Sequence, residues 1–259
     1  MAGEIIKTKG VVLAIHPWSR TSHIVTWLTP DHGCVATLVK GAVRPKSAFL
    51  GQYDLFYTCD LLYYARARAE LHALRETTPA NMRTSLRGRW RETALAGYAA
   101  GLMKDLAPAN GESKAWFEFF SAFLDRLASA ADVSVRHPTS EPPRNAPLAM
   151  LKELVWLEMG LLKLAGWAPD FSGMDMAASH TPFAIDLGRC GEGARTVRLA
   201  PGTVRALMRP DARSHGLETV EDAVRFLGVF LAYHIDTQPD VRRSLVTMLA
   251  SSLPPACSR

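Results

Sequence analysis

The first 77 residues alternate apolar and polar positions in short, β-prone runs that are separated by turn residues. These runs are 11–15, 24–29, 34–39, 53–64 and 70–77. Segment 30–33, Pro-Asp-His-Gly, predicts a hairpin between the second and third runs, because Pro presets φ and Gly accepts a positive one. Five short strands with no long helix between them predict a small antiparallel barrel of the OB type.

After Pro79 the apolar positions change to helical spacing. The predicted helices cover 95–106, 116–127, 148–165, 201–208, 220–235 and 242–249. Ser113 is the expected N-cap of the second helix. Segment 131–147 is polar and holds four prolines, which predicts a loop or linker.

The predicted fold class is therefore α+β, a five-stranded OB-type barrel followed by a mostly helical region. Residues 1–80 are expected to form an OB-fold nucleic-acid-binding domain, and residues 81–250 a helical domain. Within the second domain, segment 168–198 is expected to be irregular, with one short strand pair at 183–185 and 197–199. Residues 251–259 are expected to form a flexible tail.

Basic side chains are concentrated in the predicted barrel and the segment that follows it. Residues 1–91 hold 13 Lys or Arg and 6 Asp or Glu, whereas residues 92–259 hold 17 and 19. This asymmetry indicates that the first region faces a polyanion, and nucleic acid rewards clustered cations by phosphate neutralisation. A basic surface that only aids solubility is the alternative. The overall composition, 48% hydrophobic and 21% charged, is typical of a globular chain.

The loops of the predicted barrel carry candidate nucleic-acid contacts. OB barrels bind oligonucleotides between the loops that join strands 1–2 and 4–5. The first loop, 16–22, offers Trp18 as a stacking platform and Arg20 as a cation, and the second offers Arg66 and Arg68. Two alternatives stay open: Trp18 caps the barrel end, and the two arginines only keep a hairpin soluble.

Segment 40–46 adds three cations directly after the third predicted strand. Gly41 and Pro45 are expected to fix an exposed loop there, which would display these cations together as phosphate contacts. A further cluster between the barrel and the first helix either extends the same surface or solvates a connector. The candidates in these two segments are Lys40, Arg44, Lys46, Arg83 and Arg87.

The sequence contains none of the local motifs that mark common enzymes. It has no phosphate-cradling loop of the Walker type, no Gly-x-Gly-x-x-Gly after a strand and no Gly-x-Ser-x-Gly elbow. The carboxylates are scattered, so nothing marks a paired acid and base. We therefore expect a protein that is not an enzyme. An enzyme whose site forms only in the folded chain is the alternative.

The cysteines Cys34, Cys59, Cys190 and Cys257 lie at least 25 positions apart. This spacing predicts reduced thiols and a cytoplasmic location. His180 and Cys190 alone do not supply the four ligands of structural zinc, so no metal or other cofactor is expected. No apolar run is long enough for a bilayer, and the first residues do not form a signal peptide.

Several stretches resemble the bacterial RecO family of recombination mediators in order and spacing. Segment 38–47, Leu-Val-Lys-Gly-Ala-Val-Arg-Pro-Lys-Ser, is similar to the family's Lys-Gly-Ala-Arg-x-Pro-Lys-Ser stretch. Segment 161–170 resembles its Leu-Leu-x-x-Leu-Gly-Tyr-x-Pro pattern. Segments 10–13, 29–33, 230–235 and 242–244 complete the resemblance, which spans essentially the full length.

The resemblance implies a DNA-repair mediator with an N-terminal OB barrel. It implies binding of single- and double-stranded DNA, strand annealing, and loading of RecA onto strands covered by single-strand-binding protein, with RecR as partner. Many family members carry a four-cysteine zinc module, but segment 171–195 retains only Cys190, so metal is expected to be absent. The family's Arg after Ala42 is replaced by Val43, which leaves the charge to Lys40, Arg44 and Lys46.

The helical region is expected to bind protein partners. The acidic, apolar tail of single-strand-binding protein requires an apolar pocket with a cationic rim, and helix 148–165 with Arg205 or Arg209 nearby is the candidate. An RNA-binding or ribosome-associated OB protein would share the barrel and its charge, and it is the principal alternative. A nucleoid-associated location in the cytoplasm and no membrane partner are expected.

Overall fold

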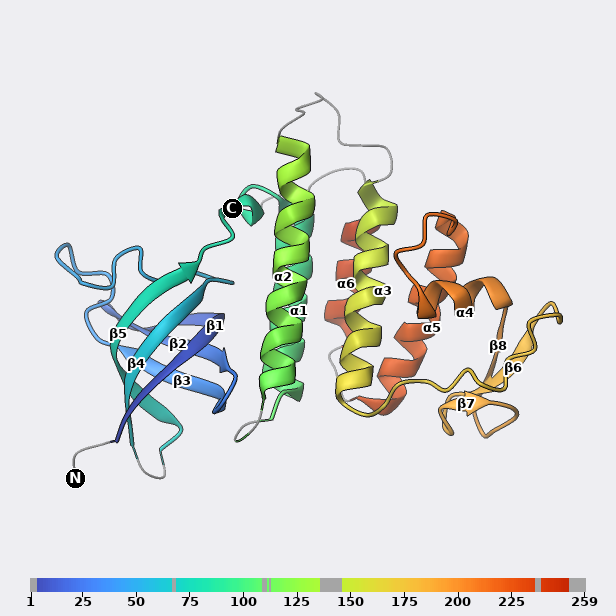
Figure 1. Ribbon diagram of the computed structural model, residues 1–259, viewed down its shortest axis with the longest axis horizontal. Coiled ribbons are helices and arrows are strands. Elements are labelled where there is room, and N and C mark those ends of the chain that lie inside the picture. The colour runs from blue at the N-terminus through green and yellow to red at the C-terminus, as the bar shows by residue number, and fades with distance from the viewer. Residues whose placement is uncertain are drawn as a thin grey trace. The chain divides into compact units, whose positions relative to one another are not determined.

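The computed structural model describes residues 4–66, 69–108, 111, 113–135, 146–235 and 239–251. The chain divides into two compact units, residues 1–136 and 137–259. Over the described residues, the first unit contains a closed β-barrel and two long helices, and the second contains four helices and a small sheet (Figure 1). Within the described residues, no helix combines the length and the apolar character that a membrane span requires.

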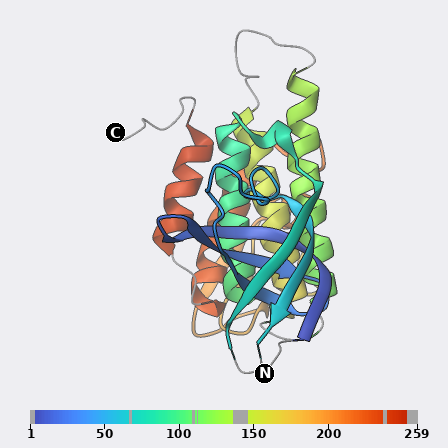
Figure 2. The same ribbon diagram turned by 90° about the vertical axis from the view of Figure 1, so that its left-hand side faces the viewer.

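Five strands close the barrel: β1 (Glu4–Ser19), β2 (Ser22–Thr29), β3 (Gly33–Val39), β4 (Thr58–Ala65) and β5 (Leu71–Asn81). Their order around the barrel is β1-β2-β3-β5-β4, with β4 hydrogen-bonded back to β1 (Figure 2). All neighbours are antiparallel except β3 and β5, which are parallel. This is the arrangement expected of an OB barrel, and the α+β class predicted from the sequence is confirmed.

Strand β1 belongs to both halves of the barrel. Its first part, from Glu4 to Val11, pairs with β4, and its second part pairs with β2. Gly10 lies near the change of partner, where a Cβ would come within 2.6 Å of Leu61 Cδ1 and 3.1 Å of Trp27 Cβ. A glycine here therefore lets the strand approach the barrel core closely.

The barrel interior is filled by alternate side chains of the five strands. Trp27 is fully buried among Val12, Val25, Val39 and Leu61. Its indole N–H donates to Thr37 Oγ1 at 2.8 Å, which satisfies the one polar atom that this ring takes into the core. The period-two pattern in the sequence is thus the inward face of each strand.

Two helices, α1 (Trp90–Leu106) and α2 (Lys114–Val135), complete the first unit after the short η1 turn (Thr84–Leu86). Ser113 precedes α2, as expected of an N-cap, and its C=O accepts from Phe117 N–H at 2.9 Å. Its hydroxyl binds the β2–β3 turn instead of the helix, since it donates to Thr29 O at 2.5 Å and accepts from Gly33 N–H at 3.0 Å.

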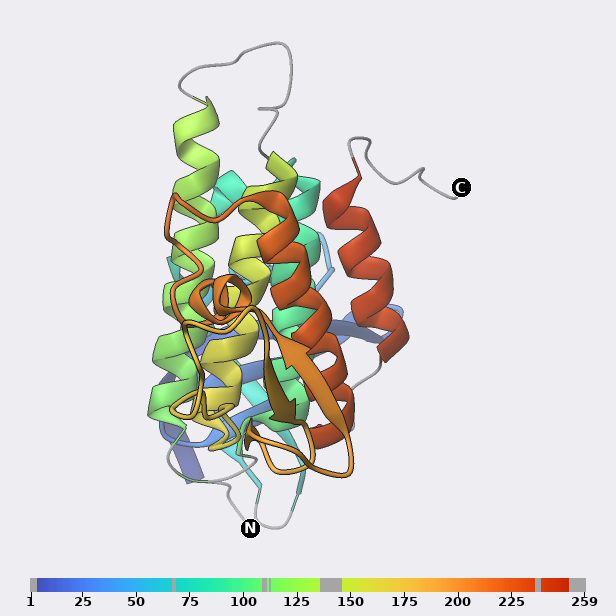
Figure 3. The ribbon, with the colours of Figure 1, turned by 90° about the vertical axis from the view of Figure 1, so that its right-hand side faces the viewer.

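The second unit packs α3 (Ala146–Leu164), α4 (Pro201–Met208), α5 (Leu217–His234) and α6 (Pro239–Ala250) (Figure 3). Strands β6 (Thr181–Ala184), β7 (Arg189–Cys190) and β8 (Thr196–Leu199) form a small antiparallel sheet in the order β7-β6-β8. Phe171, Phe183, Phe226 and Phe230 join this segment to α5, with ring centroids 5.3–6.2 Å apart.

The structure corrects three local predictions. The predicted strand 53–64 begins only at Thr58, because residues 40–57 form a succession of turns. The predicted linker 131–147 is shorter, because α2 runs to Val135 and α3 begins at Ala146. Segment 168–198 contains three short strands rather than one pair.

The first compact unit extends beyond the expected boundary at residues 80–81, because it includes α1 and α2 as well as the barrel. Independent folding of residues 1–80 stays a prediction. The expected tail, from residue 252 onward, lies outside the described residues.

Candidate nucleic-acid interface

The β1–β2 hairpin and the segment after β3 meet at one end of the barrel. Pairing of Ser19 with Ser22 closes the hairpin, and pairing of His23 with Val39 brings the end of β3 beside it. Gly41 N–H donates to Ser22 Oγ at 3.3 Å, and Val43 N–H donates to Thr21 O at 3.4 Å. Segment 40–46 is therefore held against the hairpin.

Two successive turns shape this segment. Arg44 N–H donates to Gly41 O at 3.2 Å, and Ser47 N–H donates to Arg44 O at 2.9 Å. Gly41 has φ 70°, in the left-handed region that glycine adopts without strain. Ala42 is buried in the barrel core, so it anchors the loop while the side chains around it remain in solvent.

Four exposed cations lie at this end of the barrel, one in the β1–β2 hairpin and three in the segment after β3. We call Arg20, Lys40, Arg44 and Lys46 the barrel-end cluster. In the part of the chain that the structure describes, none of them has a carboxylate partner within ion-pair distance. Their charges are therefore not neutralised locally, which is the electrostatic condition for attracting a phosphate backbone.

Trp18 lies beside the barrel-end cluster with 60% of its surface exposed. The predicted loop 16–22 is in fact the end of β1 and a two-residue turn, so Trp18 is a strand residue. It falls at a register shift between Pro17 and Ser19, and such bulges re-aim side chains. The exposure argues against the alternative that Trp18 caps the barrel interior, and it leaves the indole accessible for stacking.

Arg83 does not face solvent, so the prediction that it contacts a phosphate is not supported. Its side chain is 2% exposed. The guanidinium donates to Phe56 O at 2.8 Å, Thr58 Oγ1 at 2.9 Å and Asp125 Oδ1 at 2.6 Å. Because these acceptors come from the 40–57 turns, β4 and α2, Arg83 is an internal anchor of the first unit, and we leave it out of the interface.

Arg87 is exposed, but its charge is already engaged. It pairs with Asp54 Oδ2 at 2.6 Å and donates to Tyr57 Oη at 2.6 Å. Its guanidinium carbon also lies 5.5 Å from the centroid of the Tyr57 ring. A phosphate would have to compete with these contacts, so Arg87 is not part of the barrel-end cluster.

Arg66 is exposed in the β4–β5 turn, which lies at the other end of β1. Ala65 pairs with Glu4, whereas the hairpin follows Ser19. The Arg66 backbone N–H donates to His72 Nδ1 at 3.2 Å. Burial lowers the pKa of His72, and the charges of Arg66 and His32 lower it further. Arg68 lies outside the described residues.

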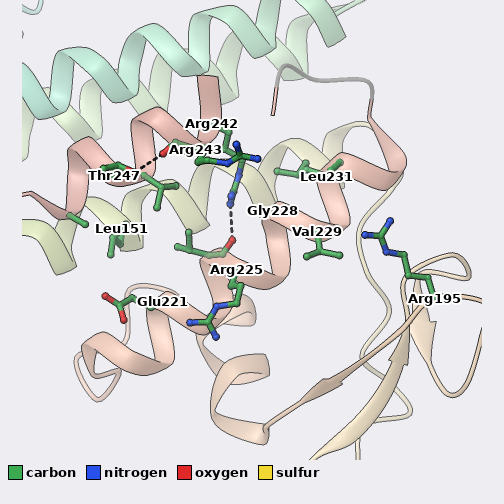
Figure 4. A pocket seen from close by; sticks show the side chains of 14 residues that line it. Leu151, Arg195, Glu221, Arg225, Gly228, Val229, Leu231, Arg242, Arg243 and Thr247 are labelled. Carbon is green, nitrogen blue, oxygen red and sulfur yellow. Dashed lines mark hydrogen bonds between the residues drawn. The ribbon is translucent and has the colours of Figure 1, made fainter. Parts of the chain in front are cut away.

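The second unit contains a pocket of about 540 Å³ that the sequence did not reveal (Figure 4). Its apolar walls come from α3, α5 and α6 and include Leu151, Val224 and Val246. Its cationic lining consists of Arg195, Arg225, Arg242 and Arg243. The predicted partner contacts Arg205 and Arg209 are exposed on or just after α4 but do not line this pocket.

Among these four arginines, and within the described residues, only Arg242 pairs with a buried carboxylate. It pairs with both oxygens of Glu158, at 2.7 and 2.8 Å, and donates to Val224 O at 2.8 Å. The pocket wall formed by α6 is thus tied to α3 and α5. Arg242 and Arg243 are adjacent in the sequence, but the sequence does not indicate that they have different partners.

Residues 168–200 hold their shape through side-chain contacts to the backbone. Asp186 accepts from Ala194 N–H at 3.0 Å and from Arg195 N–H at 3.2 Å, and these hydrogen bonds lower its pKa. Burial raises the pKa of the Cys190 thiol, and Asp170 raises it further. Over the described residues, no three His, Cys, Asp or Glu side chains converge as a metal site would require. The expected absence of zinc stays a prediction.

The pKa shifts of two thiols in the first unit make these thiols less reactive. Burial raises the pKa of both Cys34 and Cys59 to about 11. A nucleophilic cysteine requires the opposite shift, because the thiolate is the reactive form. These two residues therefore do not favour the alternative of an enzyme.

The fold defines a class: an α+β protein with a closed OB-type barrel, an exposed cationic barrel end and a mostly helical second unit. Residues 1–83 match the family described as "Recombination protein O N terminal". Fifteen curated proteins match the chain significantly. Proteins named "DNA repair protein RecO" from Anaeromyxobacter sp. (strain K), Hamiltonella defensa and Bifidobacterium longum subsp. infantis are each 27% identical to it.

These alignments cover nearly the whole of each protein. They span 93%, 92% and 85% of this chain, and 95%, 95% and 87% of the respective relatives. The chain is thus similar to RecO proteins over nearly its whole length, and its barrel matches their N-terminal family.

Proposed function

We propose that this chain is a DNA-binding recombination mediator in DNA repair. It anneals complementary strands and helps to load RecA onto single-stranded DNA that is covered by single-strand-binding protein. The observation that carries this proposal is the barrel-end cluster, four exposed cations without carboxylate partners among the described residues, beside an exposed Trp18. The similarity to RecO proteins over nearly the whole chain supports the biological role.

The proposed mechanism needs no bond-making step. Cations that contact the phosphates of two strands reduce the repulsion between them and release condensed counterions. Contacts to the backbone leave the base edges free, so complementary strands can pair while they are held. Trp18 stacks on an unpaired base and so orients one strand, a contact that tolerates any sequence.

For protein partners, we propose that the pocket of Figure 4 receives the acidic, apolar tail of single-strand-binding protein. The apolar walls would take the tail's hydrophobic side chains, and Arg195 would attract its carboxylates. Arg225 and Arg243 would join it by exchanging their exposed partners Asp222 and Asp240 for the tail. This assignment replaces Arg205 and Arg209 as the expected contacts. We propose RecR and RecA as partners, and a cytoplasmic, nucleoid-associated location, only from the similarity to RecO proteins.

The test is strand annealing of the full chain with and without single-strand-binding protein. A Lys40→Ala/Arg44→Ala/Lys46→Ala variant is expected to lose annealing in both settings, whereas Arg243→Ala should lose it only on covered strands. A control variant changes three exposed cations elsewhere, Lys104, Lys163 and Arg213, to Ala. Equal loss in the control and the barrel-end variant would contradict the proposed site.

A competition arm tests the principal alternative. If a structured RNA displaces a labelled single-stranded DNA more effectively than the same unlabelled DNA does, the RNA-binding function replaces the proposed one. The RecO-type function requires a preference for single-stranded DNA in that experiment.

A further inference from the structure

The Arg44 side chain of the barrel-end cluster lies against the backbone of Gly41. A Cβ atom placed on Gly41 would come within 3.2 Å of Arg44 Cδ and 3.4 Å of Arg44 Nε. Any side chain at this position would therefore crowd the arginine. The missing Cβ lets the Arg44 chain lie over residue 41 as far as its Nε, although Arg44 itself is exposed to solvent.

Ser22 holds the residue on which Arg44 lies. It is the first residue of β2 and is only 8% exposed. Its Oγ accepts from Gly41 N–H at 3.3 Å. Gly41 O accepts from Arg44 N–H at 3.2 Å, so both polar backbone groups of Gly41 are engaged. Val43 N–H donates to Thr21 O at 3.4 Å, which holds the same turn against the hairpin.

A guanidinium that is already oriented binds a phosphate with a smaller loss of conformational freedom. Immobilising one long side chain at an interface weakens an affinity by about two- to tenfold. Arg44 has no carboxylate partner among the described residues, so no ion pair orients it. Its contact with the backbone of Gly41 is the restraint that the structure shows instead.

We propose that Ser22 and Gly41 are positioning residues for the phosphate contact of Arg44. Ser22 holds Gly41 against the hairpin, and Gly41 supports the arginine in the orientation in which it meets the phosphate. Ser22 acts through Arg44 and does not itself touch DNA, in keeping with its burial. The inference rests on the proposed function, because the orientation of Arg44 matters for DNA only if Arg44 contacts it.

The test is a double-mutant cycle between Ser22→Ala and Arg44→Ala. Its readout is the affinity of the full chain for a labelled oligothymidylate. Ser22→Ala is expected to weaken binding by about two- to tenfold, the cost of ordering a side chain that is no longer held. In the Arg44→Ala background the same change should have almost no further effect, since no guanidinium is left to position.

Ser19→Ala is the matched control, because Ser19 is the cross-strand partner of Ser22. Its Oγ accepts from Thr21 N–H at 3.4 Å and does not bind Gly41. Its effect on affinity, whatever its size, should be the same with and without Arg44. A coupling between Ser19 and Arg44 as large as that of Ser22 would overturn the specific role of Ser22.

A second measurement needs no DNA. In ¹⁵N relaxation of the full chain, the Arg44 Nε–H group should be ordered, and it should become mobile in Ser22→Ala but not in Ser19→Ala. Gly41→Ala reaches the same contact from the other side, because its Cβ would displace the arginine. It should also release the Nε–H group, and it keeps the inference testable if Ser22→Ala does not fold.

The outcomes separate the inference from the proposed function. If Arg44→Ala weakens DNA binding but Ser22→Ala has the same effect in both backgrounds, the positioning role alone is wrong. An Nε–H group that stays equally ordered in Ser22→Ala and Gly41→Ala would also overturn it. If Arg44→Ala binds DNA as tightly as the unaltered chain, the phosphate contact of Arg44 is wrong, and the inference fails with it.

Discussion

Three arginines of the first unit show how strongly a residue's role depends on its surroundings. Arg44 is exposed and has no carboxylate partner in the described chain, Arg87 pairs with Asp54 at the surface, and Arg83 is buried under three acceptors. All three lie in segments that the sequence marks as basic and irregular. Only the structure shows that Arg44 can contact a phosphate, whereas Arg83 holds the barrel to α2.

Arg83→Ala is expected to lower the free energy of unfolding by about 2–4 kcal/mol, because it leaves Phe56 O and Thr58 Oγ1 without their buried donor. Chemical denaturation measures this change. Arg87→Ala is the matched control and should cost less than about 1 kcal/mol, since its ion pair is exposed. If the order of the two variants were reversed, the anchoring role of Arg83 would be wrong.

Trp18→Ala is expected to weaken binding of single-stranded DNA by about 1–3 kcal/mol, the usual worth of one stacked base. The free energy of unfolding should change little, because the ring is 60% exposed. Fluorescence anisotropy of a labelled oligonucleotide measures the affinity. Trp167→Ala, which removes a 45% exposed Trp from the second unit, is the control. Equal affinities of Trp18→Ala and the unaltered chain would show that Trp18 does not stack.

The thiols of Cys34 and Cys59 predict a loss of stability in alkali. Burial raises the pKa of each from 9.0 to about 11, so the folded state holds these protons more tightly than the unfolded state. Their contribution is therefore complete below about pH 9 and is lost as the pH rises through 9 to 11. Urea denaturation across this range should show a smaller loss for a Cys34→Ala/Cys59→Ala variant. An equal pH dependence in both proteins would contradict the assignment.

At the level of elements, the sequence predicted the strands and helices wherever packing on one face sets the pattern. The alternation at residues 53–57 misled because it arises from loop residues that pack on the barrel. Tyr53 donates or accepts a hydrogen bond with His23 Nδ1 at 2.8 Å and packs edge-on against Trp27, while Phe56 adopts a positive φ of 67°. The alternation of Tyr53, Leu55 and Tyr57 therefore does not mark one buried face, since Leu55 is 44% exposed whereas Phe56 is buried.

The candidate site was predictable in part, for the same reason. Lys40, Arg44 and Lys46 follow a strand and flank Gly41 and Pro45, so their exposure could be expected. The turn at 30–33 predicts the β2–β3 hairpin, but the proximity of Arg20 also requires the register that pairs His23 with Val39. The second-unit pocket depends on the packing of α6, and neither its shape nor its lining arginines could be derived from helical periodicity.

Helix α6 depends on one buried ion pair. Glu158 is fully buried, and both of its oxygens accept from Arg242. Glu158→Gln is expected to destabilise the second unit by about 3–5 kcal/mol, because it leaves the guanidinium poorly compensated. Hydrogen exchange of the α6 amides should accelerate accordingly.

The control for this change is Asp240→Asn, which removes an exposed ion pair with Arg243 on the same helix. It should alter stability by less than about 0.5 kcal/mol. Unchanged exchange rates in Glu158→Gln would show that α6 is held by its apolar contacts alone.

At the scale of the whole molecule, the two units divide the proposed work. The barrel carries the unneutralised cations that would hold DNA, whereas the second unit carries an apolar pocket with a cationic lining that would hold a protein tail. This division explains the uneven charge of the chain, because the excess of Lys and Arg lies within residues 1–91. It also predicts that variants of one unit leave the other's binding intact.

The proposed function requires that the barrel-end cluster contacts phosphates directly. The most direct measurement is the dependence of the single-stranded DNA binding constant on salt concentration for the unaltered chain and for Lys40→Ala/Arg44→Ala/Lys46→Ala. Each lost phosphate contact lowers the slope of log K against log salt by about 0.7, so the triple variant should lose about 2 units of slope. The control variant of Lys104, Lys163 and Arg213 should keep the original slope. A triple variant that binds more weakly but retains the full slope would contradict the claim.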